Sequence, residues 1–233
     1  MPIISNISNI FFPASLTIQV GAVMVWLGLV FLVSEILHRL KKEPELVRKV
    51  VHIGTGHVLL IAWWLQIPTW LCIAAGLIFS AIALASHHTN ILPMLNDVGR
   101  KTYGVFYYAL SITVLVTLLW TDYPQHAVIG VMVMSWGDGM AALIGKRFGK
   151  HIFVHLGNKR SVEGSLAMFA TSMIVVLCIF AIDHGIRPSD ISIAMPIAAI
   201  AALLEAYSPG GMDNISVPLS SAFLSYGLQS LVN

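Results

Sequence analysis

Eight long apolar runs dominate this sequence and leave few possible folds. They cover residues 16–37, 51–67, 69–86, 103–120, 126–144, 164–182, 191–206 and 215–232. A helix needs about 20 apolar residues to cross the hydrocarbon core of a bilayer, and only helices or closed barrels satisfy their backbone polar groups there. We therefore predict an all-α, polytopic transmembrane bundle of seven to eight spans. The last two runs are short enough to be tilted or partly re-entrant.

Composition agrees with this prediction. Hydrophobic residues make up 57% of the 233 residues and charged residues only 10%, whereas soluble domains carry roughly a quarter charged residues. We expect a short non-cytoplasmic tail over 1–15 and one integral membrane domain over 16–233. The net charge is only +2 and the basic residues lie in short loops, so we expect no nucleic-acid partner. Cys72 and Cys178 lie in apolar runs and are interpreted as core residues.

The basic residues predict an orientation in the membrane. Of the thirteen Lys and Arg residues, all but Arg187 fall between the first and second, third and fourth, or fifth and sixth runs. Loops rich in Lys and Arg stay on the cytoplasmic side. We therefore expect the N-terminus outside, and 39–50, 87–102, 145–163 and 207–214 in the cytoplasm.

The stretch from Trp136 to Ser165 is the strongest candidate for chemistry. Asp138 lies between two glycines inside the fifth run, and an acid within a membrane span is costly and usually functional. The alternatives are a carboxylate that reaches the membrane surface, or one that caps a neighbouring helix. The small residues Ala141, Gly145 and Gly149 fall near one helical face and also predict close helix packing.

Two cationic clusters are candidate phosphate sites. The first is the loop from Asn158 to Ser165, which places Lys159 and Arg160 at the start of the sixth run. Free backbone N–H groups at a helix start bind phosphate, although Ser161 could instead be a simple N-cap in an orienting loop. The second cluster is 48–52. The residues proposed to bind nucleotide or phosphate are Arg48, Lys49, His52, Lys146, Asn158, Lys159, Arg160, Ser161, Gly164, Ser165 and Asn214.

Further acids flank a Pro-Gly-Gly turn before the last run. Glu205 precedes this turn and Asp213-Asn214 follows it, on the same predicted membrane face as Asp138. Magnesium in a nucleotide site prefers several oxygen ligands. The alternative is a tight turn with an Asx-type cap on the last helix. We expect catalytic roles for Asp138, Glu205 and Asp213, with Asp138 and Asp213 as the metal ligands.

Four blocks together resemble the polyprenol kinase family of CTP-dependent lipid kinases, most closely its phytol kinases. The blocks are Arg48-Lys49-x-x-His52, Gly137-Asp138-Gly139-x-Ala141 running to Gly145-Lys146-x-x-Gly149, Lys159-Arg160-Ser161-x-x-Gly164-Ser165, and Asp213-Asn214-Ile215-Ser216-Val217-Pro218. They span about residues 48–220. Asn214 stands where the family pattern leads us to expect a second acid, which shifts weight to Glu205.

The resemblance implies transfer of a phosphoryl group from CTP, with Mg²⁺, to a long isoprenoid alcohol such as phytol, feeding tocopherol-type synthesis. Asp138, with Asp213 or Glu205, would hold the metal, and Glu205 or Asp213 would accept the hydroxyl proton. The implied membrane is cyanobacterial or plastid, with the alcohol's tail among the spans. Alternatives are a dolichol or diacylglycerol kinase, a phosphatidate cytidylyltransferase-like enzyme, and a small transporter. The oligomeric state is left open.

Overall fold

The computed structural model describes residues 15–89 and 103–232. Most of the predicted tail, together with Arg100 and Lys101, lies outside these ranges. The described elements are α2 Leu16–Arg39, α3 Pro44–Trp64, α4 Thr69–Thr89, α6 Gly104–Leu119, α7 Pro124–Met132, the π-helical η1 Val133–Asp138, α8 Gly139–Phe148, β1 Ile152–His155, β2 Asn158–Ser161, α9 Val162–His184, α10 Pro188–Tyr207 and α11 Asp213–Val232.

The prediction of an all-α, multi-pass membrane protein is confirmed. Within the described residues, seven helices are long and apolar enough to span a membrane, with α7, η1 and α8 forming one continuous span. The fourth predicted run, 103–120, corresponds to α6, which is apolar but only 16 residues long. The outer faces of α2 and α4 expose large apolar side chains, as expected of surfaces that contact lipid.

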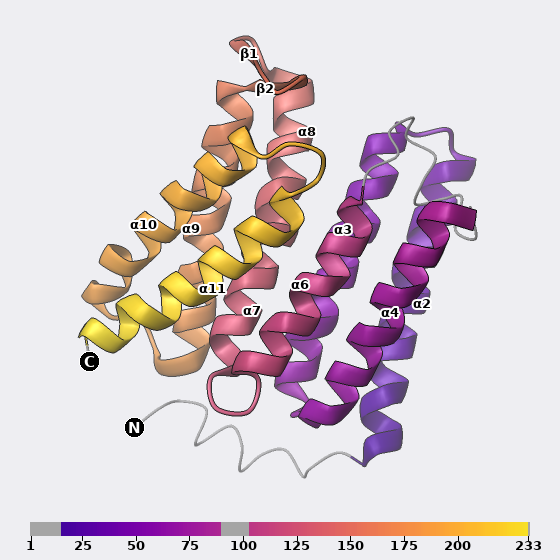
Figure 1. Cartoon of the computed structure of the whole chain (residues 1–233), viewed down its shortest axis with the longest axis vertical. Coiled ribbons are helices and arrows are strands. Elements are labelled where there is room, and N and C mark those ends of the chain that lie inside the picture. The colour runs from indigo at the N-terminus through magenta and orange to yellow at the C-terminus, as the bar shows by residue number, and fades with distance from the viewer. Residues whose placement is uncertain (1–14, 90–102, 233) are drawn as a thin grey trace.

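The span formed by α7, η1 and α8 lies at the centre of the bundle. Val128, Ile129, Val131, Val133 and Met134 have no exposed surface. The segment packs against α3 on one side and α9 and α11 on others (Figure 1). Its π-helical turn ends at Asp138, so the change in helical pitch immediately precedes the candidate acid.

The glycines around Asp138 are explained by close packing. A Cβ atom on Gly137 would lie within 3 Å of both Sδ and Cε of Met168 in α9, and one on Gly139 would lie 2.6 Å from Ile53 of α3. One on Gly164 would lie 2.9 Å from the Ala141 carbonyl oxygen. The predicted packing at Gly145 and Gly149 is confirmed, because a Cβ atom on them would lie 2.9 Å and 2.8 Å from Ser161 Oγ.

Two local predictions were incomplete. The second predicted run began at residue 51, but α3 begins at Pro44, whose fixed φ suits the first turn of a helix. This places the whole cationic cluster 48–52 on the helix. The 149–163 segment, predicted as a loop, contains the antiparallel hairpin β1–β2. Leu156 (φ 46°) and Gly157 (φ 79°) form its two-residue turn.

Candidate active site

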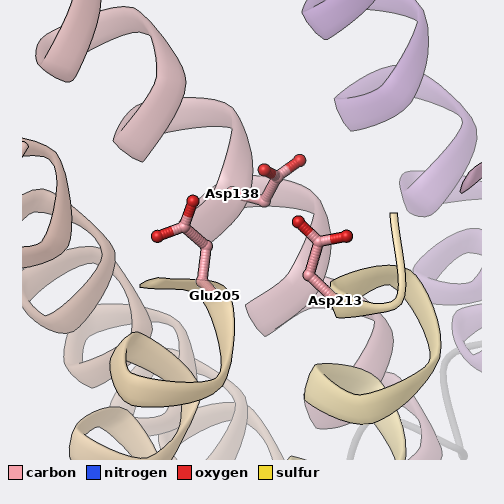
Figure 2. Close-up of side chains that lie close together, drawn as sticks. All are labelled: Asp138, Glu205 and Asp213. Atoms are coloured by element: carbon pink, nitrogen blue, oxygen red, sulfur yellow. The ribbon is translucent and has the colours of Figure 1, made fainter. Parts of the chain in front are cut away.

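Three buried carboxylates converge at one end of the bundle. Asp138 ends η1, Glu205 lies near the end of α10, and Asp213 begins α11; Figure 2 shows their side chains pointing toward one another. One oxygen from each lies within 4.8 Å of the others. Their exposed fractions are only 5%, 2% and 5%. Buried charges at this spacing require compensating partners.

Two cations from distant parts of the chain supply that compensation. Lys49 of α3 is 3% exposed and forms an ion pair with Asp138. Arg160 of β2 uses both terminal nitrogens: Nη1 lies 2.7 Å from Glu205 Oε1, and Nη2 donates to Asp213 Oδ2 at 3.1 Å. One guanidinium therefore bridges two acids, a geometry that its planar fork favours.

The hairpin explains why Arg160, and not Lys159, reaches the acids. Successive side chains on a strand point to opposite faces, and β2 alternates between half-buried Arg160 and exposed Lys159. The pairing of Arg160 with Phe153 and of Lys159 with Val154 fixes this alternation. The two adjacent cations therefore have different surroundings.

His52 forms a second contact to Asp138. Its Nε2 lies 3.5 Å from Asp138 Oδ2, and its ring packs on Tyr108 with centroids 4.4 Å apart. The Tyr108 hydroxyl is 2.6 Å from Ser135 Oγ, and the Ser135 hydroxyl in turn donates to the Val131 carbonyl. Tyr108 and Ser135 were not among the predicted site residues, and their only sequence signal was that of polar residues within apolar runs.

The start of α9 contributes both a cap and an available hydroxyl. Ser161 Oγ accepts a hydrogen bond from the Gly164 amide at 3.1 Å, which matches the N-cap alternative. Ser165 Oγ is buried and has no hydrogen-bond partner within the described part of the chain. An unsatisfied buried hydroxyl that lines a cavity favours a bound polar ligand.

The turn before α11 positions Asp213. Gly210 and Gly211 have φ values of 56° and 85°, which only glycine adopts readily. The Asn214 amide nitrogen and side chain both donate to Asp213 Oδ1, at 3.0 Å and 3.1 Å. The Asn214 side chain also donates to the Gly211 carbonyl. These hydrogen bonds orient the Asp213 carboxylate.

The other predicted cations surround this cluster at the protein surface. Arg48 Nη2 pairs with Glu45 at 2.6 Å, and Lys146 Nζ pairs with Glu43 at 2.8 Å. Arg48, Lys146, Asn158 and Lys159 all line the same cavity as the three acids. None of these four contacts the acids directly in an ion pair within the described residues. The cations Arg48, Lys146 and Lys159, with the neutral Asn158, therefore surround the opening of the cavity that holds the acids.

The cavity extends from this charged end deep into the bundle. Its volume is about 1230 Å³, and its lining runs from Asp138, Glu205 and Asp213 to apolar side chains of α2, α3, α4 and α6. This is larger than the ~300–1,000 Å³ typical of small-molecule sites. The cavity therefore accommodates a polar group at one end and a long apolar group at the other.

Comparison with known proteins identifies the family. No family model and no solved structure matches the chain. A phytol kinase from Synechocystis sp. is 43% identical over 213 residues, covering 91% of each chain. The chain belongs to the polyprenol kinase family. A probable chloroplastic phytol kinase of Glycine max is 26% identical over 91% of this chain and 77% of its own. A chloroplastic farnesol kinase of Arabidopsis thaliana is 28% identical over 79% of this chain and 66% of its own.

The donor set of this polyprenol kinase fits a magnesium ion. Mg²⁺ takes oxygen ligands at about 2.0–2.1 Å, so two ligands of one ion lie at most about 4.2 Å apart. The three carboxylate oxygens, within 4.8 Å of one another, need only a small side-chain movement to meet that limit. The sequence prediction named Asp138 and Asp213 as ligands, with Glu205 as the alternative to Asp213, and the structure brings all three acids together.

Proposed function

We propose that this chain transfers the terminal phosphoryl group of CTP to the hydroxyl of phytol, giving phytyl phosphate and CDP. Family membership makes it a kinase that acts on an isoprenoid alcohol. To this we add that CTP is the phosphoryl donor, that phytol is the alcohol, and that residues 16–233 form one catalytic domain whose active-site residues are assigned below. The phytyl phosphate would supply tocopherol-type prenyl-lipid synthesis in a cyanobacterial or plastid membrane.

The observation that carries the proposal is the two-ended cavity. A cluster of three carboxylates and several cations lies at one end, and an apolar channel between helices opens from it. A substrate that is a long hydrocarbon with one terminal hydroxyl matches this arrangement, because its two ends need opposite surroundings. A transporter of polar solutes would instead place its polar groups near the membrane midplane.

Asp138 and Asp213 are the proposed ligands of a bound Mg²⁺, which would neutralise charge on the phosphates of the nucleotide. Arg160 and Lys49 pair with the acids in the structure. With a metal held by Asp138 and Asp213, Lys49 and the Nη2 group of Arg160 would be free to bind nucleotide phosphates in the same cavity, while Arg160 Nη1 would keep its contact with Glu205. Lys159, Arg48 and Lys146 at the mouth, with the Ser165 hydroxyl, would hold the rest of the phosphate chain.

Phosphoryl transfer requires mainly positioning and charge neutralisation. The alcohol oxygen forms a bond to the terminal phosphorus, the bond from that phosphorus to the bridging oxygen breaks, and the electron pair leaves with CDP. The hydroxyl proton passes to a carboxylate. Because Asp138 and Asp213 are assigned to the metal, Glu205 is the proposed acceptor, at 2.7 Å from the Arg160 guanidinium that holds it in place.

The proposal is tested by incubating membranes that contain the protein with labelled CTP, Mg²⁺, and phytol, geranylgeraniol, dolichol or diacylglycerol. We expect phytyl phosphate and CDP as the products, with ATP a poorer donor than CTP. Preference for dolichol or diacylglycerol would reassign the substrate within the family. Release of pyrophosphate would instead support a cytidylyltransferase-like reaction.

A further inference from the structure

The apolar part of the cavity lies between two pairs of helices. In the first pair α2 packs on α3, and in the second α4 packs on α6. All four helices contribute lining side chains below the charged end, among them Val23, Leu27, Leu59, Ala62, Ala109 and Ile112. An apolar channel that begins at a reactive polar cluster has the shape required for a single hydrocarbon chain.

The far end of this channel lies at the connection between α3 and α4 and at the first turn of α4. Ile67, Leu71 and Cys72 line the cavity there. Two buried side chains hold this connection in place: Gln19 Nε2 of α2 donates to the Leu65 carbonyl at 2.9 Å, and Trp120 Nε1 donates to the Ile67 carbonyl at 3.0 Å. Gln19 and Trp120 are each 6% exposed. Hydrogen bonds in apolar surroundings have no competing water, so this end forms a fixed floor.

The depth of the channel can be measured along α3. Lys49 lies at the acidic cluster and Ala62 lines the cavity near the floor, and this thirteen-residue separation corresponds to about 20 Å at 1.5 Å per residue. An extended chain of four isoprene units has about sixteen carbon–carbon bonds and, with bonds of about 1.5 Å in a zigzag, is also roughly 20 Å long. The length of the channel therefore matches that of an extended chain of four isoprene units.

We infer that this channel is a ruler for the alcohol, and that its floor at Leu71 and Cys72 selects tails of about four isoprene units. The inference rests on the proposed function and extends it, because it assigns chain-length selection to residues far from the reacting atoms. Shorter tails leave part of the apolar channel unfilled. Longer tails meet the floor before their hydroxyl reaches the acidic cluster.

The test uses alcohols of two, three, four and six isoprene units and two readouts. The first is kcat/KM for each alcohol in membranes. The second is the shift in melting temperature that each alcohol produces in the detergent-solubilised protein without nucleotide, which reports binding alone. We expect both readouts to peak at four units, with kcat/KM at least about tenfold lower for six units, the scale on which apolar pockets discriminate size.

Two substitutions at the floor should move this optimum in opposite directions. Cys72 is half-buried, and Cys72→Phe places a ring in the channel and should shift both optima toward three units. Leu71→Ala deepens the channel and should raise kcat/KM for the six-unit alcohol relative to the four-unit alcohol. The matched controls are Leu77→Phe and Leu77→Ala on the same helix, because Leu77 is 56% exposed and does not line the cavity.

The outcomes separate this inference from the proposed function. If alcohols are phosphorylated but the six-unit alcohol reacts as well as the four-unit one, or Cys72→Phe behaves like Leu77→Phe, the ruler is wrong and the kinase assignment stands. If no alcohol is phosphorylated but the melting temperature still peaks at four units and shifts with Cys72→Phe, the ruler holds and the proposed reaction fails. A melting temperature insensitive to tail length overturns the ruler regardless of turnover.

Discussion

Asp138, Glu205 and Asp213 carry three negative charges in a space that excludes most water, and Lys49 and Arg160 bring two positive charges to them. Removing one member of a buried ion pair leaves the other charge uncompensated, which typically costs about 3–5 kcal/mol. The chain retains this arrangement at the mouth of a cavity, where a divalent cation can replace the side-chain cations. Charge balance at the level of single residues is therefore the basis of the proposed site.

Asp138→Asn should lower the rate of alcohol phosphorylation at least about 10²-fold, since it removes one preorganised electrostatic group. The substitution also leaves buried Lys49 without its acid, so membrane insertion must be measured alongside turnover. The double variant Asp138→Asn with Lys49→Met removes both charges and should restore normal protein levels without restoring activity. Asp122→Asn, at an exposed position, is the control. Wild-type turnover in Asp138→Asn would refute the site assignment.

Arg160→Lys should weaken the use of CTP by roughly 1–3 kcal/mol in kcat/KM, the range of a charge-assisted hydrogen bond. Lysine keeps the charge but cannot bridge Glu205 and Asp213 as the guanidinium fork does. Arg147→Lys is the matched control, because Arg147 is exposed and packs against Phe148. If the two variants behave alike at equal protein insertion, Arg160 has no role beyond the charge of its loop.

At the scale of elements, the hairpin determines which cation meets the acids. The sequence predicted cytoplasmic clusters around Asp138, 158–165 and 205–214, and the structure brings Arg160, Glu205, Asp213 and Asp138 together. The alternation that separates Arg160 from Lys159 could not be predicted, because four-residue strands with the pattern IFVH and NKRS carry little periodic signal. The π-helical turn before Asp138 likewise depends on packing against α3 and α9 rather than on local propensity.

The start of α3 was predicted too late in the sequence, and this hid the role of Lys49. The run at 51–67 was detected by its hydropathy, so the polar first turns of α3, which carry Arg48 and Lys49, were left outside the predicted span. A charged side chain is readily buried on such a helix when its partner comes from another element, as Asp138 does for Lys49. That partnership is long-range, and neither segment reveals it alone.

Gly157→Ala tests whether the hairpin positions Arg160. A Cβ at Gly157 has no neighbour within 4 Å, so the substitution adds only backbone strain at a φ of 79°. Strain of roughly 1–2 kcal/mol should lower kcat/KM for CTP by up to about tenfold. Leu156→Asn at the neighbouring turn position relieves strain and should match or exceed wild type. Equal kinetics for both variants would show that the hairpin does not control the site.

At the scale of the whole molecule, the hairpin and the α10–α11 connection lie at the same end of the bundle (Figure 1), and Glu205 and Asp213 flank that connection. The charge distribution predicts that this end faces the cytoplasm or stroma. A single cysteine introduced at Lys150, in a background lacking Cys72 and Cys178, should therefore react with a membrane-impermeant thiol reagent only after the membrane is opened to its inner side. Labelling from the outer side of intact cells would reverse the orientation.

The most direct test of the account follows the two ends of the CTP triphosphate separately. Wild-type protein and Asp138→Asn are incubated with phytol, Mg²⁺, and CTP labelled at either the terminal or the innermost phosphate. The account predicts that terminal label enters phytyl phosphate, that innermost label stays in CDP, and that Asp138→Asn loses the transfer at least about 10²-fold. Innermost label in the lipid product, or undiminished transfer by Asp138→Asn, would contradict it.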